Sequence, residues 1–252
     1  MKQSGWVCLC LILALCFSLP VFAQPSDKSV ETILIDDFDD QDAVDWTWSV
    51  QASKYVHIGD DENDQYPKFG YVEGIPNSLR AYRDADDEST PLVFGAQVWY
   101  DRKGDNWMEI YPANKDTGEL YEIALSGNVT QIDFWVWGAN YLYFLDVLVR
   151  DADGRVHIIH CGNLAFDGWR NFVIDIPTYI RQHSRLRSGP EQMTFVGFRI
   201  TTDPDEFVDD YVIYIDHFKY STGALAYIFD GYELQKADFG DDDSKKSDKD
   251  GQ

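Results

Sequence analysis

Carboxylates are the most abundant groups in this chain that could do chemistry. The 252 residues include 44 Asp and Glu against 21 Lys and Arg, so the formal charge is −23. A glycosidase needs two carboxyl groups held across a cleft, but these acids lie mainly in turns and near the C-terminus, and no spacing selects a pair. The sequence also lacks HExxH, CxxC, GxSxG and a Gly-rich phosphate loop. We therefore expect solvated surface acids and a protein that is not an enzyme.

One acidic group has the chemistry for a cation. Asp36, Asp37, Asp39 and Asp40 follow an early apolar run, and Asp216 lies in the last strong one. Calcium prefers such oxygen ligands, and these carboxylates would meet if the two runs paired. No EF-hand spacing is present, and ordinary turn-forming Asp is the alternative. We therefore expect no cofactor, and a structural calcium ion is the option that these carboxylates leave open.

The charge pattern limits the classes of partner. Nucleic acid and anionic membranes are poor partners for so acidic a surface, because binding them needs clustered Lys and Arg. Arginines gather in one region, which makes a local positive island: Arg170, Arg181, Arg185, Arg187 and Arg199. The island could dock an acidic neighbour, such as another copy of the chain. Solvated arginines that lay their stems along the surface are the alternative.

Residues 131–160 are the most informative stretch: QIDFWVWGANYLYFLDVLVRDADGRVHIIH. Aromatic and β-branched runs broken by a Gly-bearing turn at 151–154 indicate antiparallel strands and a hairpin. The run 141–149 is apolar on both faces. One face can enter a core, and the other must pack on something else or stay exposed. If Tyr141, Tyr143, Leu145 and Val147 lie between two sheets, the docking surface must lie elsewhere.

The elements that position these side chains are short strands. Alternating and continuous apolar runs predict strands at 32–35, 46–50, 55–58, 91–100, 107–111, 120–125, 132–137, 141–149, 156–160, 171–176, 194–201 and 211–220. No long segment has a helical period, and the best short helix is 178–186, after Pro177. We predict an all-β fold, a jelly-roll or galactose-binding-like β-sandwich, mostly antiparallel, with a short helix and long loops.

The two ends of the chain differ from its middle. Residues 1–23 form a predicted signal peptide, because Lys2 precedes an apolar segment too short to span a bilayer, followed by a small-residue cleavage site at Ala23. A retained anchor and lipidation at Cys16 are the alternatives. After cleavage no membrane span remains, and Cys161 is the last cysteine, which we expect to be buried. Residues 24–232 form a predicted single sandwich domain, and 233–252 a charged disordered tail.

A series of phrases resembles the spirochaetal flagellar filament outer layer (sheath) proteins, the FlaA family. These phrases are DDFDD at 36–40, WTWSVQASKYV at 46–56, VEGIPNSLR at 72–80, DRKGDNWMEIYP at 101–112, FWVWGANYLYFLDVLVRDADG at 134–154, GNLAFDGWRNFVIDIP at 162–177 and FRITTDPDE at 198–206. The likeness covers about 33–220. It implies a periplasmic, non-catalytic protein that coats a core of flagellin subunits and contributes to filament shape, stiffness and motility. It also implies flagellin, other sheath proteins and neighbouring copies as partners.

Two functions remain in view at this stage. An assembly protein would bury aromatic and Arg anchors against its neighbours. The candidates are Tyr141, Tyr143, Trp135, Trp137, Trp169, Arg181, Arg185 and Arg187, with Trp99 and Trp107 as further options. The alternative is a secreted carbohydrate-binding module of jelly-roll type, because such folds present aromatic platforms to sugars. Coplanar exposed Trp rings on a concave face would favour the sugar-binding function.

Overall fold

The computed structural model describes residues 28–61, 64–83, 89–184 and 192–225. Residues 29–224 form one compact unit. The predicted signal peptide and acidic tail, and both predicted domain boundaries, lie outside the described residues. No helix within the described part of the chain is long and apolar enough to cross a membrane.

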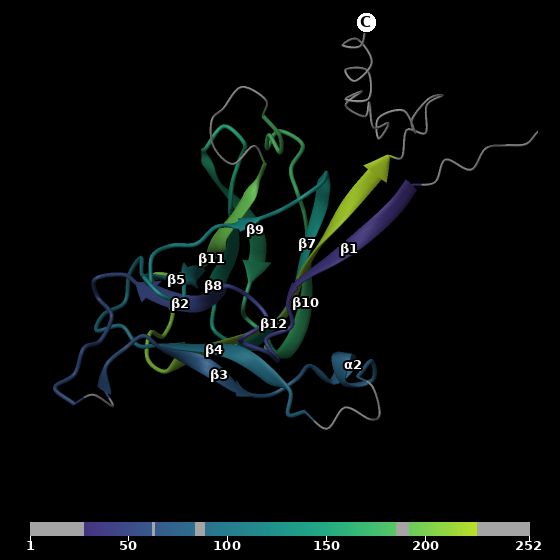
Figure 1. Cartoon of the computed structure of the whole chain (residues 1–252). Helices are drawn as coiled ribbons and strands as arrows, with labels where there is room; N and C mark the ends of the chain where they lie inside the picture. The colour runs from purple at the N-terminus through teal and green to yellow at the C-terminus, as the bar shows by residue number, and fades with distance from the viewer. Residues whose placement is uncertain (1–27, 62–63, 84–88, 185–191, 226–252) are drawn as a thin grey trace, which may run out of the picture. The chain divides into compact units, whose positions relative to one another are not determined.

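The unit is a sandwich of two six-stranded sheets (Figure 1). Sheet A has the order β10 (Asp167–Asp175), β7 (Val129–Ala139), β12 (Tyr211–Leu225), β4 (Leu92–Val98), β3 (Lys68–Glu73), with β1 (Lys28–Asp36) also paired to β12. Sheet B has the order β2 (Trp46–Ala52), β5 (Trp107–Asn114), β11 (Thr194–Thr202), β8 (Tyr143–Arg150), β9 (Val156–Asn163), with β6 (Ile123–Ala124) beside β11. Neighbours along both orders run antiparallel. The predicted all-β, mostly antiparallel sandwich is confirmed.

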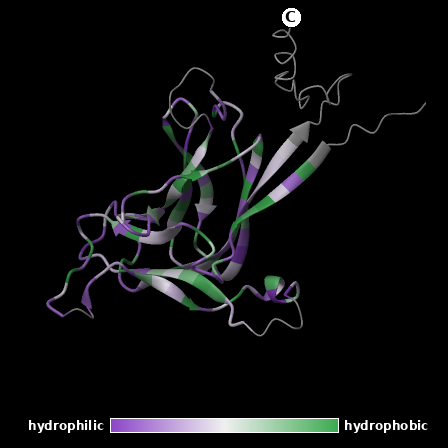
Figure 2. Cartoon of the chain, viewed as in Figure 1, coloured by the Kyte–Doolittle hydropathy of each residue, from purple (hydrophilic) through white to green (hydrophobic). Residues whose placement is uncertain are grey.

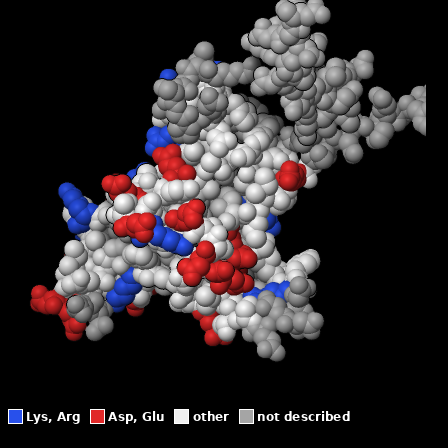
Figure 3. All heavy atoms as spheres, in the orientation of Figure 1, with Lys and Arg blue, Asp and Glu red and all other residues white. Residues whose placement is uncertain are grey.

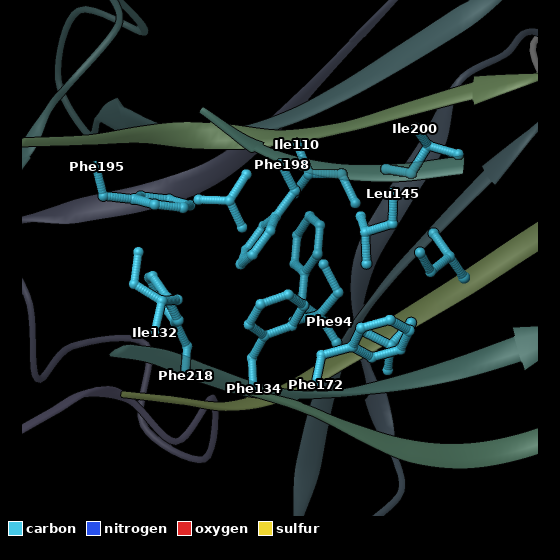
Figure 4. Packing of buried hydrophobic residues seen from close by; sticks show 14 of the residues in the cluster. Phe94, Ile110, Ile132, Phe134, Leu145, Phe172, Phe195, Phe198, Ile200 and Phe218 are labelled. Atoms are coloured by element: carbon cyan, nitrogen blue, oxygen red, sulfur yellow. The ribbon is translucent and has the colours of Figure 1, made fainter. Parts of the chain in front are cut away.

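Aromatic rings from both sheets fill the space between them. Phe134 on β7 and Phe218 on β12 meet Phe198 on β11, with the ring centres of Phe134 and Phe198 4.8 Å apart (Figure 4). Trp48 on β2 packs against this group, and its indole N–H donates to Asp36 at 2.8 Å. Apolar residues lie mainly on the strands and polar ones on the loops (Figure 2). Each fully buried ring contributes about 1.5–3 kcal/mol, so this cluster holds the sheets together.

The stretch 131–160 divides between the two sheets. Strand β7 belongs to sheet A, whereas β8 and β9 form the predicted hairpin in sheet B, closed by a turn in which the Asp151 amide donates to Arg155 O at 2.9 Å. Tyr143 is 1% exposed, and Leu145 and Val147 are fully buried between the sheets. That apolar face is therefore core, and Tyr143 is not available to a partner.

Other predictions of individual elements were wrong. The described part of the predicted helix, residues 178–184, is not helical: it begins with a turn, His183 makes an isolated bridge with Gln192, and the Gln182 side chain bonds both the amide and the carbonyl of Val129 at 2.7 Å. The helix in the described residues is instead α2 (Asn77–Arg80). Strand β3 was not predicted, and the predicted strand 55–58 makes only isolated bridges through Val56 and Ile58.

Candidate functional site

The outer face of sheet A carries a cross-strand row of aromatic residues. Trp169 lies opposite Trp137, Trp137 opposite Tyr214, and Tyr214 opposite Gly95, which faces Gly70. Opposed residues in antiparallel strands share a face and touch. The Trp137 and Tyr214 rings meet edge to face, with centres 5.5 Å apart. We call these five residues the aromatic row. Its three rings are half-buried and lie on the face of sheet A that points away from the core between the sheets.

The glycines at the end of the row shape the surface beside Tyr214. A Cβ on Gly95 would lie 2.8 Å from the Tyr214 ring, whereas one on Gly70 would meet nothing within 4 Å. The Tyr214 ring therefore lies close against the β4 backbone at Gly95. Next to it is a hollow of about 340 Å³, lined by β3, β4 and β12, including Gly70, Gln97 and Tyr214. Glycine here allows close approach of a ring to a strand backbone.

A larger pocket lies beside the aromatic row. Its volume is about 640 Å³, and it is lined by Asp37, Asp39, Ile75, Leu79, Tyr82, Arg83, Pro91, Trp135, Asn171, Asp216, His217 and Lys219. Trp135 lies between Asn171 and Asp216 in the next cross-strand register. We call this the α2 pocket, because α2 supplies one wall. In Figure 3 acidic side chains gather near α2, with basic side chains beside them.

A β-bulge in β12 adds His217 and Lys219 to the side of the strand on which Asp216, in regular register with Trp135, already faces the α2 pocket. The register with β7 shifts between Asp216 and Lys219, and His217 has a φ of 53°. An extra residue in one strand breaks the alternation of faces. Phe218 therefore enters the core, while Asp216, His217 and Lys219 all line the pocket.

The buried carboxylates of this region have raised pKa values. Burial raises the pKa of Asp216 to about 7, and the nearby charges of Asp39, Asp37 and Asp36 add to the increase. Burial likewise raises the pKa of Asp36 to about 6, although bonds from Trp48 and the Phe38 amide oppose it. Burial lowers the pKa of His217, and the charge of Lys219 lowers it further. The pocket thus has a negative potential near Asp216.

Asp216 and the acidic loop after β1 do come together, as the calcium prediction required. Two carboxylates, one at the end of β1 and one in this loop, already accept hydrogen bonds from protein donors. Asp36 accepts from the Phe38 amide and the Trp48 indole, and Asp39 accepts from the Leu92 amide and Arg83. No group of three or more His, Cys, Asp or Glu among the described residues is arranged to hold a metal. The residues present do not fit a calcium shell.

The predicted arginine island does not form a single patch among the described residues. Arg170 lies over the Phe166 ring at 3.9 Å, Arg181 is 3.4 Å from Asp153, and Arg199 is 3.1 Å from Glu109. Arg170 and Arg199 belong to different sheets. Arg185 and Arg187 lie outside the described residues, so their docking role stays a prediction.

The remaining aromatic candidates have internal roles. Tyr141 packs edge to face on Tyr143, and its hydroxyl donates to Asp209 O at 2.9 Å. Trp99 stacks on His57, and Trp107 lies under Arg199. Cys161 is partly buried against the core, and burial raises its pKa to about 12.

Sequence reasoning found Trp135, Trp137 and Trp169, which the structure brings onto one outer face. It missed Tyr214, Gly95 and Gly70, because their place beside the tryptophans depends on the register of β12 with β4 and β7. The only local signal was the apolar content of 211–220 at both parities. The rings of Trp137 and Tyr214 are inclined at 68°, so they do not form the coplanar platform that the sugar-binding function predicts.

Comparison of the sequence with known protein families and with curated proteins identifies the family of this chain. Residues 33–226 match the model described as "Flagellar filament outer layer protein Flaa". A putative flagellar filament outer layer-like protein of Brachyspira hyodysenteriae is 27% identical over 51% of this chain and 56% of its own length. The flagellar filament outer layer protein of Treponema pallidum is 32% identical over 43% of this chain and 31% of its own length. The chain thus spans about half, or less, of the length of these curated relatives.

Solved structures with a similar fold include a family 11 carbohydrate-binding module of a Clostridium thermocellum cellulosomal cellulase. It is 11% identical, with a TM-score of 0.36, over 78% of this chain and 96% of that one. A cleaved adhesin domain of Lys-gingipain from Porphyromonas gingivalis is also 11% identical, with a TM-score of 0.33, over 78% and 99%. At these TM-scores the likeness says nothing about ligands.

Proposed function

Because this chain belongs to the flagellar filament outer layer (FlaA) family, we propose that it is a structural subunit of the outer layer, or sheath, of a periplasmic flagellar filament. In this role it coats a core of flagellin subunits and contributes to filament shape and stiffness, and hence to motility. The family match supports the proposal because it covers 33–226, which includes nearly all of both sheets.

The aromatic row is the observation that carries the proposed docking role. A chain with a formal charge of −23 keeps Trp169, Trp137 and Tyr214 together on one outer face. A few anchors, often aromatic, dominate the binding energy of protein interfaces. Truncating one such side chain to Ala commonly costs about 2 kcal/mol or more of binding free energy. We propose that this face packs against flagellin or a neighbouring sheath subunit.

The acid–histidine pairs of sheet B fit a structural role better than a catalytic one. His157 contacts Asp151 at 2.7 Å, and His160 contacts Asp146, so both pairs join strand β9 to β8 or to the turn between them. They fasten the edge of the sheet. We therefore propose a non-catalytic protein. The predicted signal peptide at 1–23 supports export to the periplasm.

Deletion of the gene tests this function. Flagellar filaments isolated from the deletion strain should be thinner, with altered curvature in electron micrographs, and swimming should be impaired. Restoring the gene should return the parental diameter. Filaments of parental diameter and curvature, together with normal swimming, would contradict the proposal.

A further inference from the structure

The α2 pocket contains more acid than its own cations neutralise. Its two strong cations are already paired: Arg83 lies 2.9 Å from Asp39, and Lys219 lies 3.5 Å from Asp133. Asp37 and Asp216 form no ion pair with any described residue. These two carboxylates are the part of the lining that a ligand could still engage.

Asp216 is the unusual member. The residue is 4% exposed, yet it lines the pocket, and no side chain in the described part of the chain donates a hydrogen bond to it. The backbone amide of its neighbour His217 is the donor that favours its charged form. A buried carboxylate is normally paired with a cation or bonded to several donors, because burying an unpaired charge is costly. The regular pairing of β12 with β7, in which Asp216 lies opposite Trp135, places it there, and the bulge follows it.

An aromatic wall accompanies the acids. Trp135 is opposite Asp216 in the register of β7 with β12, and both residues line the pocket. A Trp ring face attracts an ammonium or guanidinium group, and this attraction adds to that of a nearby carboxylate. Ile75, Leu79 and Pro91 line the same pocket and can contact the apolar stem of a long cationic side chain.

We propose that the α2 pocket receives a lysine or arginine side chain of the protein on which this subunit docks. The inference rests on the proposed docking role and names the chemistry of the partner at that face. The choice of occupant follows from charge: Asp37 and Asp216 offer two unpaired carboxylates beside an aromatic ring. A metal ion fits less well, because Asp36 and Asp39 already bind protein donors. A cation bound here would offset the repulsion among the acids.

The binding should depend on pH. The titratable and charged groups around Asp216 are Asp36 at the end of β1, Asp37 and Asp39 from the loop after it, Arg83 from the segment after α2, Asp133 from β7, and His217 and Lys219 from β12. Asp216 has a raised pKa of about 7, so it is largely neutral at pH 6 and charged at pH 8. A cationic side chain should therefore bind about tenfold more tightly at pH 8 than at pH 6.

The test uses the purified, isotope-labelled protein and two blocked tripeptides, acetyl-Gly-Lys-Gly-amide and acetyl-Gly-Gln-Gly-amide, followed by NMR. The Lys peptide should shift the amide signals of Asp37, His217 and Lys219 and the Trp135 indole signal, and the Gln peptide should not. Asp216→Asn should weaken binding by about tenfold or more, since a charge-assisted bond is lost. Asp37→Asn should weaken it less, and because Asp37 is exposed its fold should be intact. Asp105→Asn, on an exposed loop, should bind like the parent.

Several outcomes would overturn the proposal. Equal binding of the two peptides would show that charge is not recognised, and unchanged binding by both Asp variants would show that the pocket is not the site. Shifts produced only by calcium chloride, or only by a neutral oligosaccharide such as cellotetraose, would assign the pocket to a metal or a sugar. A failed peptide test with normal attachment to filaments would remove this proposal alone. Unaltered filaments in the deletion strain would remove the proposed function instead.

Discussion

The outer faces of the two sheets each carry a row of side chains across five antiparallel strands, but the residues of the two rows differ in polarity. On sheet A the aromatic row crosses from Trp169 to Gly70. On sheet B the corresponding cross-strand row is polar: Gln51, Glu109, Arg199, Asp146 and His160 lie opposite one another across β2, β5, β11, β8 and β9. We call this the polar row. One face presents rings and the other presents charges.

The two rows differ in whether their groups already have a polar or charged partner on the same sheet. Gln51 donates to Glu109 at 2.6 Å, Arg199 lies 3.1 Å from the same carboxylate, and His160 contacts Asp146. Each charge of the polar row has a partner on its own sheet. The rings of the aromatic row can still bury more surface, and burial of apolar surface drives association. The difference identifies sheet A as the face to test for docking.

The largest expected effect comes from the inner face, on which both outer faces depend. Phe134→Ala should lower the free energy of unfolding by about 3–5 kcal/mol, because the ring packs against Phe172, Phe198 and Phe218 between the sheets. Trp135→Ala, one residue along β7 and on the outer face, should cost much less. Denaturant unfolding measures both. Equal losses would mean that the outer ring is as important to the fold as the core ring.

Buried carboxylates on the two outer faces should respond in opposite directions. Asp216 on sheet A and Asp146 on sheet B are 4% and 6% exposed. The pKa of Asp216 is about 7 in the folded state, against an ordinary value of 3.8 in the unfolded chain. The folded state therefore loses stability as the pH rises between these two pKa values. Asp216→Asn should therefore stabilise the protein at pH 8, by up to about 4 kcal/mol, and the gain should vanish toward pH 4.

Asp146→Asn should instead destabilise the protein by about 1–2 kcal/mol, because it disturbs the bond with His160. Thermal unfolding of both variants at pH 4, 6 and 8 provides the comparison. A gain for Asp216→Asn that is the same at every pH would show that relief of a buried charge is not its cause.

Two glycines of the aromatic row should differ in how well they tolerate a methyl group. Gly95→Ala places a Cβ 2.8 Å from the Tyr214 ring and should cost about 1–3 kcal/mol through displacement of that ring. Gly70→Ala, the matched control, meets no atom within 4 Å and should change stability by less than about 0.5 kcal/mol. The shift of the Tyr214 ring is visible by NMR. Similar costs at both positions would contradict the contact between Tyr214 and the β4 backbone.

The smallest effect should come from neutralising the polar row. Glu109→Gln together with Arg199→Gln should lower the free energy of unfolding by less than about 1 kcal/mol, because both charges of this half-buried pair are removed together and neither is left unpaired. Chemical denaturation in low and high salt measures this. A larger loss would mean that the polar row holds sheet B together.

The sequence predicted the class of fold better than it predicted which strands share a sheet and which face of each strand is buried. Alternation in 194–201 and 171–176 predicted β11 and β10, and the Gly-bearing turn predicted the β8–β9 hairpin. The sequence could not show that β7 and β8 lie in different sheets, because both runs are apolar and chain order does not specify sheet membership. Pro177 suggested a helix, but the Gln182 bonds to Val129 hold that segment against β7.

The candidate site was predictable only in part. Three tryptophans were chosen by residue type, and they share one face. Tyr143, chosen on the same ground, is core, because a strand with two apolar faces gives no sign of which is inner. The pairing that places Asp216 opposite Trp135, and the bulge at His217 that follows it, depend on long-range contact with β7 and have no local sequence mark.

The most direct test is attachment of purified protein to flagellar filaments from which the outer layer has been stripped, measured by co-sedimentation. The sheet A variant is Trp137→Ala with Tyr214→Ala, and the sheet B control is Glu109→Gln with Arg199→Gln. Both should first be shown to be folded by circular dichroism. We predict that the sheet A variant binds at least about tenfold more weakly and that the control stays within about twofold of the parent. Parental binding by the sheet A variant, or loss of binding by the control alone, would contradict docking through the aromatic row.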